Sequence, residues 1–274
     1  MTGEGLSKQY CRVLTIAGSD SGGGAGIQAD LKTFSANGCY GTSVITALTA
    51  QNTVGVSGIH PLPVAFVRQQ IEAVLADIGT DAVKIGMLFS PELICCVADE
   101  LERFQITKIV LDPVMVATSG DKLLQDDAIL ALKNRLVPLA SIITPNLPEA
   151  EVLFGRRIKT VAMVAEAAAG LTSLGCANIL IKGGHFDDAA SDDLLYLGKE
   201  KRSRILTGTR IPTKNTHGTG CTLSSAIAAN MARGKDVEEA VVLAKEYISG
   251  AVAAGADYVI GKGHGPVHHF YRFF

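Results

Sequence analysis

The strongest constraint on the fold is a regular alternation of short apolar segments with longer stretches of helical pattern. The apolar segments read RVLTIAG, TSVITALTA, DAVKIGML, TKIVLDPV, ASIITPN and ANILIKGG, and a helix's length of chain separates each from the next. Strands that alternate with helices form βαβ units, whose parallel strands are buried on both faces. The alternation therefore predicts an α/β fold with a central, mostly parallel sheet flanked by helices in three layers.

The pattern changes once near the C-terminal third of the chain. Residues 191–211 (SDDLLYLGKEKRSRILTGTRI) place a GKEK turn between two apolar runs, which indicates a small antiparallel hairpin on the sheet edge. Helical patterns follow over 220–233 and 237–255. Because no Pro-rich, Ser-rich or charged linker interrupts the pattern, we predict one domain over 12–274 after a flexible N-terminal extension, 1–11.

Composition narrows the class of function. The net charge is −2, with no basic block, which argues against a nucleic-acid partner and favours a small-molecule ligand. The six cysteines show no C-x-x-C spacing, so reduced thiols are expected. The uncharged stretch between Lys32 and Arg68 is interrupted by polar residues and cannot span a bilayer, and the N-terminus lacks a signal-peptide pattern. These features predict a cytoplasmic protein.

Polar residues follow several of the predicted strands, at the sheet edge where open α/β folds bind ligands. The first such segment, AGSDSGGGAGIQADLKT (17–33), has neither a P-loop ending nor the glycine spacing of a dinucleotide fingerprint, but its glycines let a ligand approach the backbone. Asp30, in the helix that follows, fits a ligand contact and a solvated helix face equally well. Gln51 could pair with a heterocycle through its amide or stabilise a turn.

Further acidic and basic residues end the later strands. In VLDPVM (110–115) a predicted strand ends at Asp112. Asn146 and Glu149 lie three residues apart in ITPNLPEAEVL, where they could bind Mg²⁺ or form a helix-capping box. Lys182 follows ILI, where a lysine is often only a surface residue. His185 and His217 lack metal-ligand spacing, which argues against zinc. The C-terminal tail contains His264, His268 and His269, which we interpret as surface residues.

The segment NTHGTGCTLSSAIAA (215–229) joins a glycine turn directly to an apolar helix. The start of such a helix presents unpaired N–H groups and the positive end of the helix dipole, which suit a phosphate or an oxyanion. Cys221 stands in the first turn, where it faces that anion unless it is an inert helix-start cysteine.

Taken together, AGSDSGGGAGIQADLKTF, ALTAQNT, KIGML, DPVM, TPNLPEAEVL, IKGGH and THGTGCTLSSA resemble the hydroxymethylpyrimidine/phosphomethylpyrimidine kinases of thiamine biosynthesis. These enzymes belong to the ribokinase-like superfamily, and the resemblance spans about residues 12 to 270. One departure concerns the first loop, where the family often has proline after the aspartate. Ser21 follows Asp20 here, which predicts a looser loop.

The resemblance implies a role for each candidate residue and implies ATP and Mg²⁺ as cofactors. The aminopyrimidine pocket would be lined by Gly18, Ala25, Asp30, Gln51, Met87 and Val114. The nucleotide side would be formed by Asp112, Asn146, Glu149 and Lys182, with Asn146 and Glu149 holding Mg²⁺ directly or through water. Gly218, Thr219 and Gly220 would form the anion hole beside Cys221, the catalytic base. The superfamily's common homodimer is expected as well.

A cysteine in place of the aspartate found in other branches of the superfamily has a physical explanation. These kinases phosphorylate an alcohol and then the resulting phosphate monoester, whose attacking oxygen is already largely ionised. We hypothesise that Cys221 ionises for the first acceptor and stays protonated for the second, although a helix N-terminus also lowers a thiol's pKa. The alternatives are a pyridoxal kinase, a non-catalytic pyrimidine or nucleotide sensor and, on the weakest grounds, a nicotinamide dehydrogenase.

Overall fold

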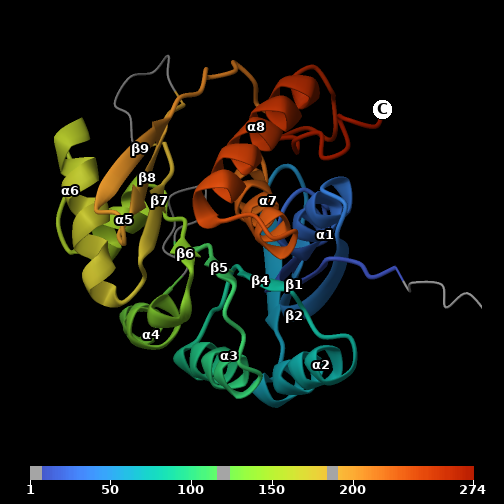
Figure 1. Ribbon diagram of the computed structural model, residues 1–274. Helices are drawn as coiled ribbons and strands as arrows, with labels where there is room; N and C mark the ends of the chain where they lie inside the picture. Colours follow the sequence, from blue (N-terminus) through green and yellow to red (C-terminus); the bar gives the residue numbers. More distant parts are fainter. Residues whose placement is uncertain (1–7, 116–123, 184–190) are drawn as a thin grey trace, which may run out of the picture.

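A nine-stranded sheet runs through the part of the chain that the computed structural model describes, residues 8–115, 124–183 and 191–274 (Figure 1). Its strand order is β3-β2-β1-β4-β5-β6-β7-β8-β9. The strands are β1 (Arg12–Asp20), β2 (Tyr40–Gln51), β3 (Val56–Pro61), β4 (Ala82–Ile85), β5 (Ile109–Leu111), β6 (Ile142–Ile143), β7 (Asn178–Ile181), β8 (Asp193–Leu197) and β9 (Arg202–Leu206).

Helices connect most of these strands. They are α1 (Gly26–Ala36), α2 (Val64–Asp77), α3 (Pro91–Arg103), α4 (Asp126–Ala131), α5 (Leu147–Phe154), α6 (Val161–Leu171), α7 (Thr219–Ala232) and α8 (Val237–Gly255). Short 3-10 or π turns extend α4 and α6, as η1 (Leu132–Leu136), η2 (Val137–Leu139) and η3 (Thr172–Leu174). The observed α7 and α8 confirm the two helices predicted after the hairpin.

The directions of the strands confirm a mostly parallel sheet. β2, β1, β4, β5, β6 and β7 pair in parallel, and β8 and β9 form the predicted antiparallel hairpin at one edge. β3 pairs antiparallel with β2 at the other edge and was not predicted. All of its residues are exposed, and its sequence, VSGIHP, lacks the alternating apolar pattern that reveals a half-buried strand.

Neighbouring residues of the central strands point to opposite faces of the sheet and enter two separate cores. Val110 belongs to the core under α1, α7 and α8, whereas Leu111 belongs to the core under α2 to α6. Ile142 and Ile143 divide in the same way. Figure 1 shows α7 and α8 on one side of the sheet and α2 and α3 on the other. The three-layer arrangement predicted from the sequence is therefore confirmed.

The C-terminal tail packs against the helical layer that carries α7. His269 is 5% exposed, and its Nε2 lies 3.1 Å from Thr222 Oγ1. Burial lowers its pKa to about 4. The interpretation of these histidines as surface residues is therefore wrong for His269. Among the described residues, no cluster of three or more His, Cys, Asp or Glu side chains has the geometry of a metal site.

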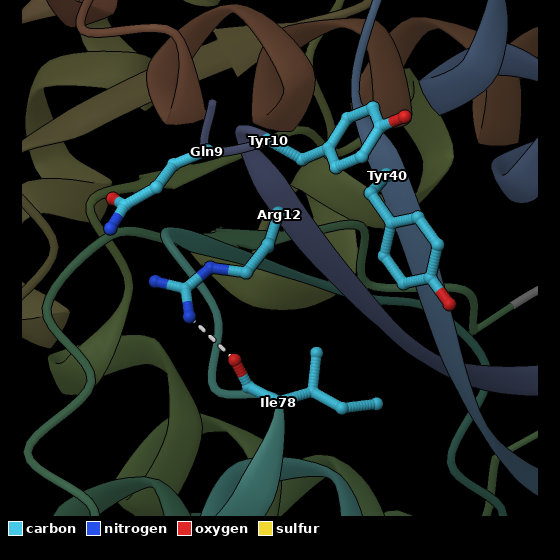
Figure 2. A pocket seen from close by; sticks show the side chains of 5 residues that line it. All are labelled: Gln9, Tyr10, Arg12, Tyr40 and Ile78. Carbon is cyan, nitrogen blue, oxygen red and sulfur yellow. Dashed lines mark hydrogen bonds between the residues drawn. The ribbon is translucent and has the colours of Figure 1, made fainter. Parts of the chain in front are cut away.

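A shallow depression lies at the amino ends of β1 and β2, where the N-terminal segment joins the sheet (Figure 2). The Arg12 guanidinium in it already donates to Asp81 Oδ1 (2.9 Å) and to the Ile78 carbonyl (2.5 Å). The depression lies at the opposite end of the strands from the predicted ligand site. It is lined by Gln9, Tyr10, Arg12, Tyr40 and Ile78.

Candidate active site

Asp20, the last residue of β1, holds the first glycine loop in shape. Its Oδ1 accepts from the N–H of Gly22 (2.8 Å), and its Oδ2 accepts from the N–H groups of Gly24 (3.0 Å) and Ala25 (2.8 Å). Burial alone would raise the pKa of Asp20, but hydrogen bonds from His217 and from the loop's backbone outweigh it and lower the pKa. The carboxylate therefore stays charged, and the loop is fixed around it.

Ser21 fastens the same loop to the end of β2. Its hydroxyl donates to the Gln51 carbonyl (2.7 Å) and accepts from the Gln51 N–H (2.8 Å). These two hydrogen bonds hold the loop to β2, and the looser loop predicted from the missing proline stays a prediction. The Gln51 side chain extends toward the start of α7, with its Nε2 3.3 Å from His217 Nε2.

The glycine turn before α7 packs directly on the first glycine loop. Gly218 has φ +78°, and a Cβ there would lie 1.8 Å from the Gly24 carbonyl oxygen. His217 Nε2 lies 2.9 Å from Asp20 Oδ2, and this contact also joins the two turns. A side chain at either glycine would separate the turns. Only glycine fits Gly218, since L-residues avoid this backbone conformation.

The first turn of α7 carries the residues of the predicted anion hole, whose function stays a prediction. Gly218 caps the helix, and the Thr219 N–H donates to the Thr216 carbonyl (3.2 Å). In the described part of the chain, the N–H groups of Gly220 and Cys221 have no backbone acceptor. They are therefore free to donate to an anion, and the helix dipole favours negative charge at the same place.

Asp112 and Lys182 form an ion pair that faces this turn. Lys182 Nζ lies 2.7 Å from Asp112 Oδ1, and a Cβ on Gly220 would lie 3.3 Å from the same Nζ. Thr144 and Ser224 also donate to the Asp112 carboxylate, at 3.1 and 3.2 Å. The alternative of a surface lysine at position 182 is wrong, because its side chain is only 16% exposed.

Asp112 and Lys182 each stabilise the charged form of the other. Burial alone would raise the pKa of Asp112, but Lys182 and Lys84 lower it overall. Burial alone would lower the pKa of Lys182, but Asp112 and Glu149 raise it overall. Both groups are therefore charged at neutral pH, and a cation stands beside the anion hole.

Asn146 and Glu149 form the capping box that the sequence offered as the alternative to a metal site. The Glu149 N–H donates to Asn146 Oδ1 (2.9 Å), and Glu149 Oε2 accepts from the Asn146 N–H (2.8 Å). Glu149 Oε1 accepts from the Met115 N–H at 3.3 Å. Helix capping and metal binding do not exclude one another, since each carboxylate oxygen has a second lone pair.

Magnesium fits the chemistry of this donor set. Glu149 is 3% exposed, and burial together with the charge of Asp112 raises its pKa to about 7, although Lys182 opposes the shift. Because Lys182 and the backbone donors do not offset the effect of burial on the Glu149 pKa, a bound cation would stabilise the charged carboxylate. Mg²⁺ binds through one or two carboxylates and completes its shell with water and substrate phosphates, so the absence of a larger acidic cluster here is no obstacle.

Replacing Glu149 by glutamine should remove a pH dependence of stability. The pKa of Glu149 is raised in the folded chain, so its contribution to stability is present below pH 4.5 and is lost as the pH rises toward about 7. This loss is on the order of 3 kcal/mol. Thermal unfolding without nucleotide at pH 4.5 to 7.5 should show a flatter profile for Glu149→Gln. Parallel profiles would contradict the assignment.

Cys221 is a half-buried free thiol in the first turn of α7. Burial raises the pKa of the thiol, and the charges of Asp30 and Asp112 raise it further. Lys84 and a hydrogen bond from the Gly26 N–H act in the opposite direction without reversing the shift. The thiol is therefore protonated at neutral pH, despite its position at a helix N-terminus.

Asp30 does not lie on a solvated helix face, because the structure buries it completely. Lys84 Nζ lies 2.9 Å from both carboxylate oxygens. The hydroxyls of Thr15 and Ser225 donate to one oxygen each, at 2.6 Å. Three donor side chains thus make four hydrogen bonds to the carboxylate. Its predicted contact with the pyrimidine stays a prediction, and it would require one of these bonds to open.

The other predicted pocket residues lie at the carboxyl ends of the strands. A Cβ on Gly18 would lie 2.9 Å from Met87 Cε, so these two positions meet across β1 and β4. Ala25 precedes α1, and Val114 follows Asp112 by two residues. Their contact with a substrate stays a prediction. His185 lies outside the described residues.

Sequence reasoning missed the functions of Asp20, His217 and Lys84. An aspartate two residues before a run of glycines is a natural acceptor for several backbone N–H groups, and this signal was available. The lysine in DAVKIGML was visible inside an apolar strand pattern, where a charge requires a buried partner. The partner of His217 is 197 residues away and had no local signal.

Comparison with solved structures agrees with the fold. The ADP complex of Bacillus subtilis pyridoxal kinase is similar over 97% of this chain and all of that chain, with a TM-score of 0.89 and 37% identity. Phosphomethylpyrimidine kinase from Clostridium difficile is similar over 88% of this chain and 99% of that chain, with a TM-score of 0.78 and 46% identity. The fold and site define a ribokinase-like kinase of small molecules.

The chain belongs to the phosphomethylpyrimidine kinase family, whose sequence pattern matches residues 20–268. The hydroxymethylpyrimidine/phosphomethylpyrimidine kinase of Rhizobium meliloti is 52% identical over 94% of this chain and 97% of its own length. The thiamine biosynthesis bifunctional protein ThiED of Geobacter sulfurreducens is also 52% identical over 94% of this chain. The match covers 52% of that longer relative, so the chain spans about half of it.

Proposed function

We propose that the protein uses ATP and Mg²⁺ to phosphorylate 4-amino-5-hydroxymethyl-2-methylpyrimidine and then its monophosphate, giving the diphosphate for thiamine biosynthesis. The functions for which its relatives are named support this activity. The observation that carries it is the first turn of α7, where a protonated thiol, free N–H groups and the Asp112–Lys182 pair meet. This arrangement suits transfer of a phosphoryl group to an oxygen acceptor.

The acceptor would lie on the side of the site formed by β1, β2 and β4. Gly18 leaves room beside Met87 for a flat ring, because a side chain there would meet the methionine. The Gln51 amide offers a donor and an acceptor to the polar edge of the ring. These residues orient the hydroxymethyl group toward Cys221.

The nucleotide phosphates would lie on the side formed by β5, β6 and β7. The N–H groups of Gly220 and Cys221, with the Lys182 ammonium, would stabilise negative charge on the transferred group. Mg²⁺, held through Glu149 and Asn146, supplies further neutralisation of the phosphates when bound. Asp112 holds the lysine in place and keeps it charged.

The raised pKa of Cys221 explains how one site serves two acceptors. A loose transition state requires little early proton removal, so the minor thiolate form of Cys221 suffices to accept the proton of the alcohol. A permanent carboxylate about 4 Å from the monoester would cost on the order of 4 kcal/mol per unit charge at an effective dielectric constant near 20. A protonated thiol avoids this repulsion during the second step.

The test is a count of ADP released per acceptor. Purified protein is incubated with excess ATP and Mg²⁺ and limiting pyrimidine alcohol, and the products are identified by mass. About two ADP per pyrimidine with a diphosphate product would support the proposal. No Mg²⁺-dependent ADP release would favour a non-catalytic binding protein instead.

A pyridoxal kinase is the second candidate, favoured by the similarity to the Bacillus subtilis enzyme. Pyridoxal carries a hydroxymethyl group on an aromatic heterocycle, so it presents the same reacting atom. It is tested in parallel with the pyrimidine. One ADP per pyridoxal, with little turnover of the pyrimidine, would move the assignment to this activity.

A homodimer paired through β3 is proposed as the oligomeric state. Edge strands present unpaired N–H and C=O groups to another chain, and Val56 (50% exposed) and Ile59 (54%) add apolar surface. Light scattering should give a dimer mass for the native chain and a monomer mass for Ile59→Lys. Val161→Lys, on α6 near the other sheet edge, is the matched control. A monomeric native chain would contradict the proposal.

Two further observations concern the environment of the protein. Within the described residues, no helix combines the length and the apolar character needed to cross a membrane. All six cysteines are free thiols. Because free thiols persist in reducing compartments, cysteine usage supports a cytoplasmic location as part of the proposal.

A further inference from the structure

A buried ion pair lies beneath the first turns of α7. Asp30 on α1 and Lys84 on β4 are both fully buried, and Lys84 Nζ lies 2.9 Å from each carboxylate oxygen of Asp30. Burying a charge pair removes both ions from water, so apolar residues of similar size would often stabilise a fold equally well. The pair therefore calls for an explanation other than stability.

The Asp30 carboxylate connects α1 to three other elements. Lys84 reaches it from β4, Thr15 from β1 and Ser225 from α7. Ser225 follows Cys221 by four residues, so the two side chains lie on the same side of α7, one turn apart. The hydroxyl of Ser225 is held at 2.6 Å from Asp30 Oδ1. This hydrogen bond ties α7 to α1 and holds the helix in position relative to the sheet.

The same pair acts electrostatically on the thiol. Lys84 lowers the pKa of Cys221, whereas Asp30 raises it. Asp112, after β5, also raises it, and Lys182, after β7, is itself influenced by Cys221. Both ion pairs therefore act electrostatically on the thiol, and the one formed by Asp30 and Lys84 contacts neither predicted metal ligand in the described structure.

We infer that Asp30 and Lys84 are positioning residues of the phosphoryl transfer: through Ser225 they hold α7 so that Cys221 and the N–H groups of the anion hole stay aligned, and Lys84 places a positive charge beneath the thiol. This inference rests on the proposed kinase activity for its kinetic consequence. Its electrostatic consequence is independent of any substrate. The two consequences are tested separately.

The first test measures alkylation of Cys221 by iodoacetamide against pH, with the modified peptide followed by mass spectrometry. Lys84→Met should raise the apparent pKa of Cys221 and slow alkylation at fixed pH by about threefold to tenfold. Asp30→Asn should lower the pKa and speed alkylation. Shifts in the same direction, or no shift in either variant, would overturn the inference.

Loss of one charge leaves its partner buried alone, so a single variant could fail to fold. The double variant Asp30→Asn/Lys84→Met removes both charges and should return the pKa of Cys221 toward its native value. Ser225→Ala removes only the hydroxyl contact and keeps both charges. Glu100→Gln is the control, because Glu100 is equally buried but pairs with Arg68 and Arg103 on the α2–α3 side.

The second test separates positioning from substrate contact. Ser225→Ala and the double variant should lower kcat for both phosphorylations by about tenfold or more, with KM for the pyrimidine changed less than about twofold. A raised KM for the pyrimidine with unchanged kcat would instead make Asp30 a substrate-binding residue and overturn the inference. If the native protein shows no kinase activity, the proposed function fails, while the alkylation result still decides the electrostatic part.

Discussion

Replacing Cys221 by aspartate is expected to slow the second phosphorylation more than the first. The thiol is protonated at neutral pH because burial raises its pKa. An aspartate would place a carboxylate beside the anion hole, where it would repel the incoming phosphate monoester but could still accept a proton from the alcohol. The ratio of the two rates, measured with each acceptor supplied separately, is the quantity that should change.

Cys221→Ala is the companion variant. It removes the base without adding a charge, so kcat for the alcohol should fall by about 10²- to 10⁴-fold. Turnover of the monoester should fall much less, because its oxygen is already ionised. Cys95→Ser, at another half-buried thiol on α3, controls for general effects of cysteine loss. Equal losses in both steps for Cys221→Asp would contradict the charge argument.

Gly218→Ala is expected to slow both phosphorylations by about 100-fold or more. Its added Cβ would lie 1.8 Å from the Gly24 carbonyl oxygen, and a backbone atom cannot rotate away as a flexible side chain would. The φ of +78° adds strain of about 1–2 kcal/mol for an L-residue. Relief requires the two glycine turns to separate. A displacement near 1 Å at the anion hole is enough for a loss of about 100-fold.

Gly234→Ala separates backbone strain from the lost contact. Gly234 follows the other end of α7 with φ +88°, and a Cβ there would meet nothing within 4 Å. It should cost about 1 kcal/mol of stability and leave kcat unchanged. Thermal unfolding and steady-state kinetics of the two variants give the comparison. Similar activity in both would show that the contact between Gly218 and Gly24 is not required.

The layers of the fold could be predicted from the sequence because buried parallel strands leave a strong apolar signal. The hairpin of β8 and β9 and the helices α7 and α8 had equally clear local patterns. β3 had none, since an exposed edge strand such as VSGIHP requires no apolar residues to be stable next to β2. β3 forms because it pairs with β2, and a local sequence pattern cannot reveal such a pairing.

Candidate residues could be recognised at the predicted strand ends and helix starts, but their roles came only from the resemblance, and most of their contacts could not be predicted. Asn146 and Glu149 are adjacent on a helix start, so their capping box was visible in the sequence. The environments of Asp30 and Cys221 depend on Lys84 and Asp112, which come from other strands. Burial and charge at such positions are set by tertiary packing, and this is why the direction of the pKa shift of Cys221 was open before the structure.

The contact between Asp20 and His217 also affects the stage of folding at which the candidate site forms. The two residues are 197 positions apart, and Asp30 and Ser225 are 195 apart. Contacts of such long sequence separation form late, because the chain must close a large loop first. During synthesis, the first glycine loop leaves the ribosome long before the helix start that completes it. A nascent chain that ends before residue 217 therefore lacks both the contact of Asp20 with His217 and the start of α7.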